Sequence, residues 1–321
     1  MRYFSYIIIL SLLPLLACES PKKKADLSGG MQIVATTGMV ADLVKNIGGD
    51  SVEVQALMGP GVDPHLYKAT QGDLSKLQQA DIIFYNGLHL EGKMGEVLKR
   101  LGQIKPVVAV AENIPQDALL DDPVYTGTAD PHIWFDVSLW AQCIASVEEA
   151  LAAHDPEHAT YYATNAKAYL QELNELHRWV SQEMKKIPAD KRILITAHDA
   201  FNYFGSAYDM EVRGLQGIST LSEFGLRDRV DLVNFIVEKQ IRAVFVETSV
   251  SEKNINSIVE GCRQKGHEVW IGGNLYSDAM GAAGSPEGTY LGMVKANVRT
   301  MVAGLSETTE VEGMSGATEN Y

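Results

Sequence analysis

The chain has 321 residues, enough for two domains, and its 46% hydrophobic and 21% charged residues are typical of a folded globular protein rather than of a long disordered one. The formal net charge of −14 repels polyanions, which argues against nucleic acid as a partner. After the first seventeen residues no run approaches the ~18 apolar residues of a membrane-spanning helix, so none is predicted there.

The N-terminal segment has the pattern of an export signal. Arg2 is followed by the apolar residues 7–17, a run too short to span a bilayer, and Cys18 comes directly after it. The end of this segment, LLAC, resembles a bacterial lipobox, in which the cysteine is lipidated and becomes the mature N-terminus. We therefore expect residues 1–17 to be a signal peptide and Cys18 to carry the lipid. The alternative is a plain signal peptide with a chance cysteine.

The first half of the mature chain alternates between strand and helix patterns. Residues 18–30 are polar and predict a flexible tether. Strands are predicted at 33–36, 52–58, 81–85 and 107–110, and helices around 40–47, around 74–77 and at 91–101. This alternation is typical of βαβ units and a parallel sheet.

A long helical pattern at 155–187 follows. Asp155-Pro156-Glu157 is a favourable helix start, and apolar residues then recur every three or four positions from Tyr162 to Val180. About thirty helical residues would extend roughly 45 Å, enough to run along two lobes. The alternative is an ordinary surface helix of one lobe.

The second half repeats the strand and helix alternation. Strands are predicted at 193–196, 212–218, 243–246 and 269–271, and helices at 227–240, 251–265 and 288–304. Ser249 and Glu252 have the spacing of a capping box before the second of these helices. Residues 306–321 are acidic and lack periodicity, which predicts a disordered tail.

The expected fold is therefore α/β, with two lobes that each contain a four-stranded, mainly parallel sheet flanked by helices, joined by one long linker helix. The predicted divisions are a signal peptide (1–17), a lipid-anchored tether (18–30), an N-terminal lobe (31–154), the linker helix (155–187), a C-terminal lobe (188–305) and the tail (306–321). Cys143 and Cys262 fall on predicted helices of different lobes, so we expect buried, unpaired thiols rather than a disulfide.

Four residues that can ligate a metal follow predicted strands. His65 and His132 each end an Asp-Pro-His triplet, His198 ends the first strand of the second half, and Asp278 follows the last. In open parallel sheets, ligands bind beyond the carboxyl ends of the strands. The proline stiffens the loop that carries each of the first two histidines. Three imidazoles and one carboxylate form a set suited to zinc or another first-row dication.

The motifs around these residues resemble those of the metal-binding lipoproteins of zinc and manganese ABC transporters, the TroA-like cluster A-I substrate-binding proteins. The matching segments run from about residue 32 to 304 and include GPGVDPHLYKATQGDL, YNGLHLE, DPHIWFDV, TAHDAFNYF, GLQGIS and YSDAMG. The resemblance implies a site of His65, His132, His198 and Asp278, two lobes joined by one long helix, and delivery of the metal to a membrane permease. We expect a monomer that is not an enzyme, exported and held by its lipid on the periplasmic or outer face of a membrane.

The resemblance implies that the transported ion is zinc or manganese. Three imidazoles favour zinc. Zinc-dedicated members of the family often carry a His-rich insertion between the first two ligands, and this chain has only His89 between His65 and His132, which leaves manganese or both metals open. Asp63, Asp130, Asp136, Asp199 and Glu247 are candidates to orient the imidazoles. Two alternative functions are a metal-stabilised surface adhesin and a zinc-dependent hydrolase; no HExxH or Gly-x-Ser-x-Gly motif supports the latter.

Overall fold

The computed structural model describes residues 30–122, 127–221 and 224–306. The predicted signal peptide, Cys18, the tether up to residue 29 and residues 307–321 of the predicted tail lie outside them. Among the described residues, no helix combines the length and the apolar character needed to cross a bilayer.

The first lobe is built on a parallel sheet with the strand order β2-β1-β3-β4. Side chains alternate between its faces: Ile33 and Ala35 join the core beneath α1, whereas Val34 joins the core beneath α2 and α3. Both faces are therefore covered by helices, as parallel sheets require. The elements are β1 (Met31–Ala35), α1 (Gly38–Gly48), β2 (Val52–Ala56), α2 (Gln71–Gln79), β3 (Ile82–Tyr85), α3 (Gly95–Leu101), β4 (Val107–Ala109), α4 (Val137–Trp140) and α5 (Cys143–His154).

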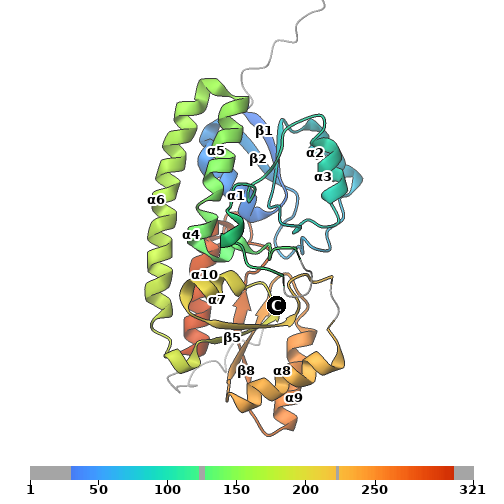
Figure 1. Ribbon diagram of the computed structural model, residues 1–321, viewed down its shortest axis with the longest axis vertical. Coiled ribbons are helices and arrows are strands. Elements are labelled where there is room, and N and C mark those ends of the chain that lie inside the picture. The colour runs from blue at the N-terminus through green and yellow to red at the C-terminus, as the bar shows by residue number, and fades with distance from the viewer. Residues whose placement is uncertain (1–29, 123–126, 222–223, 307–321) are drawn as a thin grey trace, which may run out of the picture.

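The helix α6 (Ala159–Met184) runs beside both lobes (Figure 1). It contacts α1 and α5 of the first lobe and α10 (Tyr290–Leu305) and α7 (Asn202–Tyr208) of the second. Its apolar stripe from Tyr162 to Met184 is buried in one hydrophobic core that includes residues of both lobes. The long joining helix predicted from the sequence is thus confirmed, and it is packed against both lobes rather than one.

The second lobe contains four parallel strands in two pairs, β5-β6 and β7-β8, with β5 in contact with β7. The predicted α/β lobe is confirmed, but the expected single sheet is divided at its centre. At the carboxyl end of this division the backbone N–H of His198 donates to the Glu247 carboxylate, so a side chain joins the two pairs there. The elements are β5 (Ile193–His198), β6 (Glu211–Gln216), α8 (Leu226–Glu238), β7 (Ala243–Glu247), α9 (Lys253–Gln264) and β8 (Trp270–Leu275).

Two local predictions have different outcomes. The capping box expected at Ser249 and Glu252 is wrong: α9 begins at Lys253, and the Ser249 hydroxyl instead bonds the hydroxyl of Ser277. Cys143 in α5 and Cys262 in α9 are both buried free thiols, as predicted.

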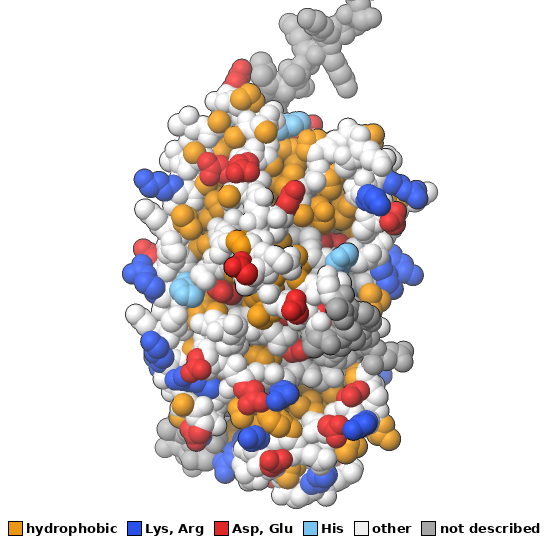
Figure 2. All heavy atoms as spheres, viewed as in Figure 1, with side chains coloured by type: hydrophobic (Ala, Val, Ile, Leu, Met, Phe, Trp, Pro, Cys, Tyr) orange, Lys and Arg blue, Asp and Glu red, His pale blue; other side chains and the backbone are white. Residues whose placement is uncertain are grey.

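The molecular surface carries both signs of charge. In the upper part of the space-filling view, basic side chains lie along the edges of the visible face, and in the lower part basic and acidic side chains are interspersed (Figure 2). This face presents no broad basic area that would attract a polyanion.

Candidate metal centre

The four candidate ligands come from four separate segments. His65 lies in the connection between β2 and α2, and His132 directly precedes a 3-10 turn (Ile133–Phe135). His198 is the last residue of β5, and Asp278 follows β8. Because parallel strands of each lobe end at the same edge, these segments meet where the two lobes face each other.

The structure brings all four side chains together in the interior. One ligand atom from each residue lies within 4.8 Å of the others, and no side chain of the four is exposed. The Nε2 atoms of His65 and His132 are 3.3 Å apart. The Asp278 carboxylate lies 3.2 Å from Nε2 of His198, 3.4 Å from Nε2 of His132 and 4.0 Å from Nε2 of His65. A tetrahedral ion with bonds of about 2.0–2.1 Å places its ligand atoms about 3.3 Å apart. The three shorter distances match that spacing, and the distance between His65 and Asp278 exceeds it.

Polar atoms at the centre lack partners. Both carboxylate oxygens of Asp278 and Nε2 of His198 are buried and accept or donate no hydrogen bond to any described residue. The two groups lie close together but are not aligned as a hydrogen bond. A buried polar atom without a partner costs about 1–3 kcal/mol, so these atoms indicate a site built for a cation between them.

Two of the imidazoles are oriented by buried carboxylates. Nδ1 of His132 lies 2.7 Å from Asp130, and Nδ1 of His198 lies 2.5 Å from Glu247. With the proton on Nδ1, each ring presents the lone pair of Nε2 to the centre of the site. Such outer carboxylates also raise the basicity of a ligating imidazole.

His65 is held differently. Within the described part of the chain, Nδ1 of His65 has no hydrogen-bond partner. Its backbone N–H donates to Oδ1 of Asp63 (2.8 Å), and Oδ2 of Asp63 accepts from the hydroxyl of Thr220 (2.6 Å). Asp63 belongs to the first lobe and Thr220 to the second, so this histidine is positioned through its backbone and through a bond between lobes.

The buried imidazoles of the cluster differ in how readily they take up a proton. Burial lowers the pKa of His65 to about 3. Burial acts in the same direction on His132, but Asp130 and Asp278 outweigh it and raise the pKa of His132 to about 9.

His198 and Asp278 are coupled in the same way. Burial opposes the protonation of His198, yet Glu247 and Asp278 raise its pKa well above the ordinary value. Burial would raise the pKa of Asp278, but His198 and His132 hold it well below the usual range. Three carboxylates thus surround three imidazoles in the buried interior, an arrangement that stabilises a dication.

The other candidates for orienting the imidazoles have separate roles. Asp130 and Glu247 contact ligand rings, as predicted, and Asp63 contacts the His65 backbone. Asp136 instead caps α4, where it accepts from the backbone of Ser138. Asp199 accepts a bond from Asn202 through its backbone carbonyl, and its Oδ1 is buried without a partner among the described residues.

The remaining histidines lie away from this group. His89 is exposed, and His267 is bonded to the carbonyl of Ile241. His158 pairs with Asp155 at the start of α6, and His177 is partly buried against the hydroxyl of Tyr208.

Sequence reasoning missed several residues that support the site. Thr220 holds Asp63, Asn202 bonds the Asp130 carboxylate, and the indole of Trp134 donates to the carbonyl of Ser277 beside Asp278. Each contact joins segments far apart in the chain, and only the motif GLQGIS, which immediately precedes Thr220, gave a signal near one of them.

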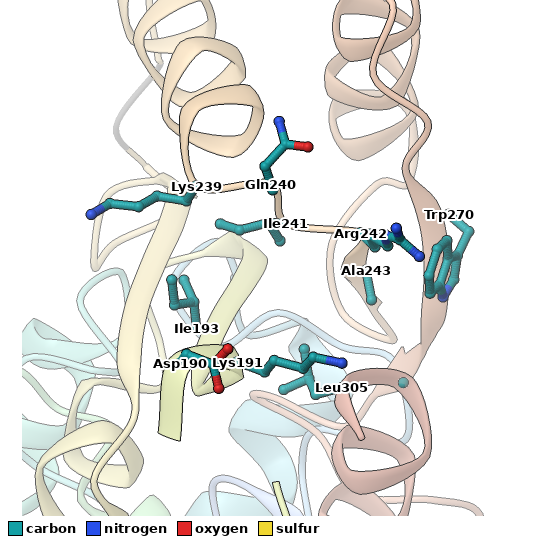
Figure 3. Close-up of a pocket in the computed structure, with 11 residues that line it drawn as sticks. Asp190, Lys191, Ile193, Lys239, Gln240, Ile241, Arg242, Ala243, Trp270 and Leu305 are labelled. Carbon is teal, nitrogen blue, oxygen red and sulfur yellow. The ribbon is translucent and has the colours of Figure 1, made fainter. Parts of the chain in front are cut away.

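Cavities occur at the site and away from it. A cleft of about 550 Å³ between the lobes is lined by Asp278 together with Asp42, Lys45 and Pro60 among others. Another cavity, of about 360 Å³, lies at the opposite end of the second lobe, between Lys191, Ile241 and Trp270 (Figure 3). None of the four candidate ligands lines that second cavity, so it has no part in the metal centre.

Comparisons with known proteins match this arrangement over most of the chain. The family described as zinc-uptake complex component A, periplasmic, matches residues 33–304. The manganese-binding lipoprotein MntA of Bacillus subtilis is 52% identical over 288 residues, which cover 89% of this chain and 93% of that protein. The zinc-binding protein TroA of Treponema pallidum is 47% identical over 284 residues, 88% of this chain and 92% of that protein. Its solved structure superposes with a TM-score of 0.84 and covers 87% of this chain and 100% of that one.

Proposed function

This chain belongs to the family of periplasmic component A of zinc-uptake complexes, and we propose that it captures a divalent transition-metal ion outside the cytoplasm and delivers it to the permease of an ABC transporter. The observation that carries this proposal is the buried group of three imidazoles and one carboxylate with unsatisfied polar atoms at its centre. Such a group has a clear use in holding a cation and none in stabilising the fold.

The proposed ligands are His65, His132, His198 and Asp278, each through one atom. Nε2 of each imidazole and one oxygen of Asp278 would complete a tetrahedral set. Asp130 and Glu247 would hold two of the rings in the required tautomer.

The ion is zinc or manganese. One relative is named for manganese and another for zinc, at similar identity to this chain. Imidazole ligands bind zinc more tightly than manganese in the general order of divalent metals. Cargo in the cell also depends on which ion is available, so we propose uptake of zinc, of manganese, or of both.

A hydrolase or an adhesin accounts less well for the site. Catalytic zinc usually keeps three protein ligands and an open position for water, whereas four protein ligands converge here in a buried pocket. An adhesin would need the metal only for stability, and the relatives matched here are named as binding proteins.

We propose that the chain is exported and anchored to a membrane by a lipid. The signal peptide (1–17) would be removed, Cys18 would be lipidated, and residues 18–30 would tether the monomer to a membrane on its extracytoplasmic side. The lobes would comprise 31–154 and 188–305, with 155–187 between them and a free tail at 306–321. Support comes from the lipobox-like pattern and from a relative named as a lipoprotein.

The test is elemental analysis of protein isolated from its own cells without added metal. We expect about one equivalent of zinc plus manganese. Single Ala substitutions of His65, His132 or His198 should abolish that content, whereas His154→Ala should leave it unchanged, because His154 ends α5 away from the cluster. A wild-type protein without any transition metal would contradict the proposal.

A further inference from the structure

The loop that carries His65 bridges the two lobes. It connects β2 to α2, and it contacts the second lobe at two points. Thr220 donates to Asp63, and Gly61 lies so close to the carbonyl of Thr248 that an added Cβ would stand 3.3 Å from it. Gly61 also has a φ of 70°, which favours glycine. The loop is therefore packed against the second lobe and hydrogen-bonded to it.

The other two histidine ligands are fixed within their own surroundings. His198 belongs to a strand and bonds Glu247 of the neighbouring strand. His132 bonds Asp130, whose own carbonyl accepts from Tyr203. Among the described residues no carboxylate bonds Nδ1 of His65, although the Asp278 carboxylate lies 4.0 Å from its Nε2, and His65 sits on an irregular segment. Among the three histidines, it is the one whose position depends most on a single contact outside the site.

That contact is the hydrogen bond from Thr220 to Asp63. Asp63 accepts the backbone N–H of His65 with one oxygen and the Thr220 hydroxyl with the other. A movement of the loop away from the second lobe must break this bond. Leu66 and Leu221, which flank it in sequence, are 45% and 48% exposed, so the bond lies near the surface, where a docking partner can reach it.

We propose that Thr220 is a positioning residue for metal release: its hydroxyl, acting through Asp63, holds the His65 loop closed over the bound ion and thereby slows dissociation. This inference rests on the proposed function. In the closed state the bond resists withdrawal of His65, and a permease that displaces Thr220 frees the ligand without any change at the other three.

The experiment measures the rate at which zinc leaves the loaded full chain after mixing with excess chelator. Thr220→Val removes the hydroxyl and keeps the shape, and Thr220→Ala removes it with a smaller side chain. Both should raise the dissociation rate constant about tenfold, the factor expected when a hydrogen bond to a charged group is lost from the bound state. The association rate constant and the melting temperature of the metal-free protein should change little.

Two further variants separate positioning from a general effect. Thr220→Ser keeps the hydroxyl and should restore the wild-type rate. Thr164→Val removes a similar bond, from Thr164 to the carbonyl of Thr160 on the exposed side of α6, and should have no effect.

Three results would overturn the inference: wild-type release from both Thr220→Val and Thr220→Ala, fast release from Thr220→Ser, or equal acceleration by Thr164→Val. A wild-type chain that binds no zinc contradicts the proposed function itself, which distinguishes the two failures.

Discussion

Glu247 offers the sharpest test of how the metal centre is built. Its carboxylate is buried at the end of β7, where one oxygen accepts the backbone N–H of His198 at 2.8 Å and the other accepts Nδ1–H of the same residue at 2.5 Å. Glu247→Gln keeps the shape but replaces one acceptor with an NH₂ donor. Either the backbone N–H of His198 then faces another donor, or Nδ1 accepts from the NH₂ group and the ring proton moves to Nε2, which must be free to bind a metal.

The size of the effect follows from these contacts. The substitution removes the charge that favours Nδ1 protonation and weakens the hold on the ring, while it leaves all four ligands in place. Outer carboxylates of this kind typically contribute 10–100-fold to metal affinity, which corresponds to about 1.4–2.8 kcal/mol at 25 °C. We expect a loss in this range for zinc.

The assay is competition with a chelator of known affinity, because direct titration fails for tight sites. Asp155→Asn is a matched control: Asp155 also bonds Nδ1 of a histidine, His158, at 2.7 Å, but at the exposed start of α6. It should leave zinc affinity within twofold. An affinity loss below twofold for Glu247→Gln, or an equal loss for Asp155→Asn, would refute the reasoning.

Four other predictions address the ion, the motion, the stability and the anchor. Zinc should displace manganese from the purified protein, because imidazoles favour the later metals; manganese retention at equal concentrations would contradict this. Metal loading should change the radius of gyration in small-angle scattering only slightly, since α6 cannot bend without breaking its hydrogen bonds, and a change of several ångströms would disprove it. Burial raises the pKa of the Glu91 carboxyl above its ordinary 4.5, against the hydrogen bonds from Thr36 and Asn86, so the folded state holds this proton more tightly than the unfolded chain does. The free energy of unfolding should therefore fall as pH rises from below 4.5 through the folded-state pKa. In urea titrations at several pH values, Glu91→Gln should lessen that fall. If the free energies of unfolding of wild type and Glu91→Gln change in parallel with pH, the prediction is wrong. Cys18→Ser should abolish labelling by a radioactive fatty acid and release the protein from membranes.

Local pattern was enough for most of the fold. The four strands of the first lobe, the long helix and the four strands of the second lobe follow from hydrophobic periodicity, because burial on one or both faces demands that spacing. The division between β5 and β7 does not follow, since which strands pair depends on contacts between segments tens of residues apart. Ser249 is another example of a contact that local pattern does not predict. Its spacing from Glu252 fits a helix cap, but the fold brings Ser277 beside it, and the two hydroxyls form a hydrogen bond instead.

The candidate ligands were identifiable from the sequence because a strand end, an Asp-Pro-His triplet and a residue type that binds metal are all local features. The contacts that hold the ligands are only partly local. Asp130 lies two residues from the ring that it orients, so it could be foreseen, whereas Glu247 reaches His198 across 49 positions and Thr220 reaches Asp63 across 157. Only the packing of the two lobes against α6 brings such residues within hydrogen-bond distance. The sequence by itself therefore determined which atoms are available to a metal, and the tertiary structure decided which of them are held in place and which one is secured from the opposite lobe.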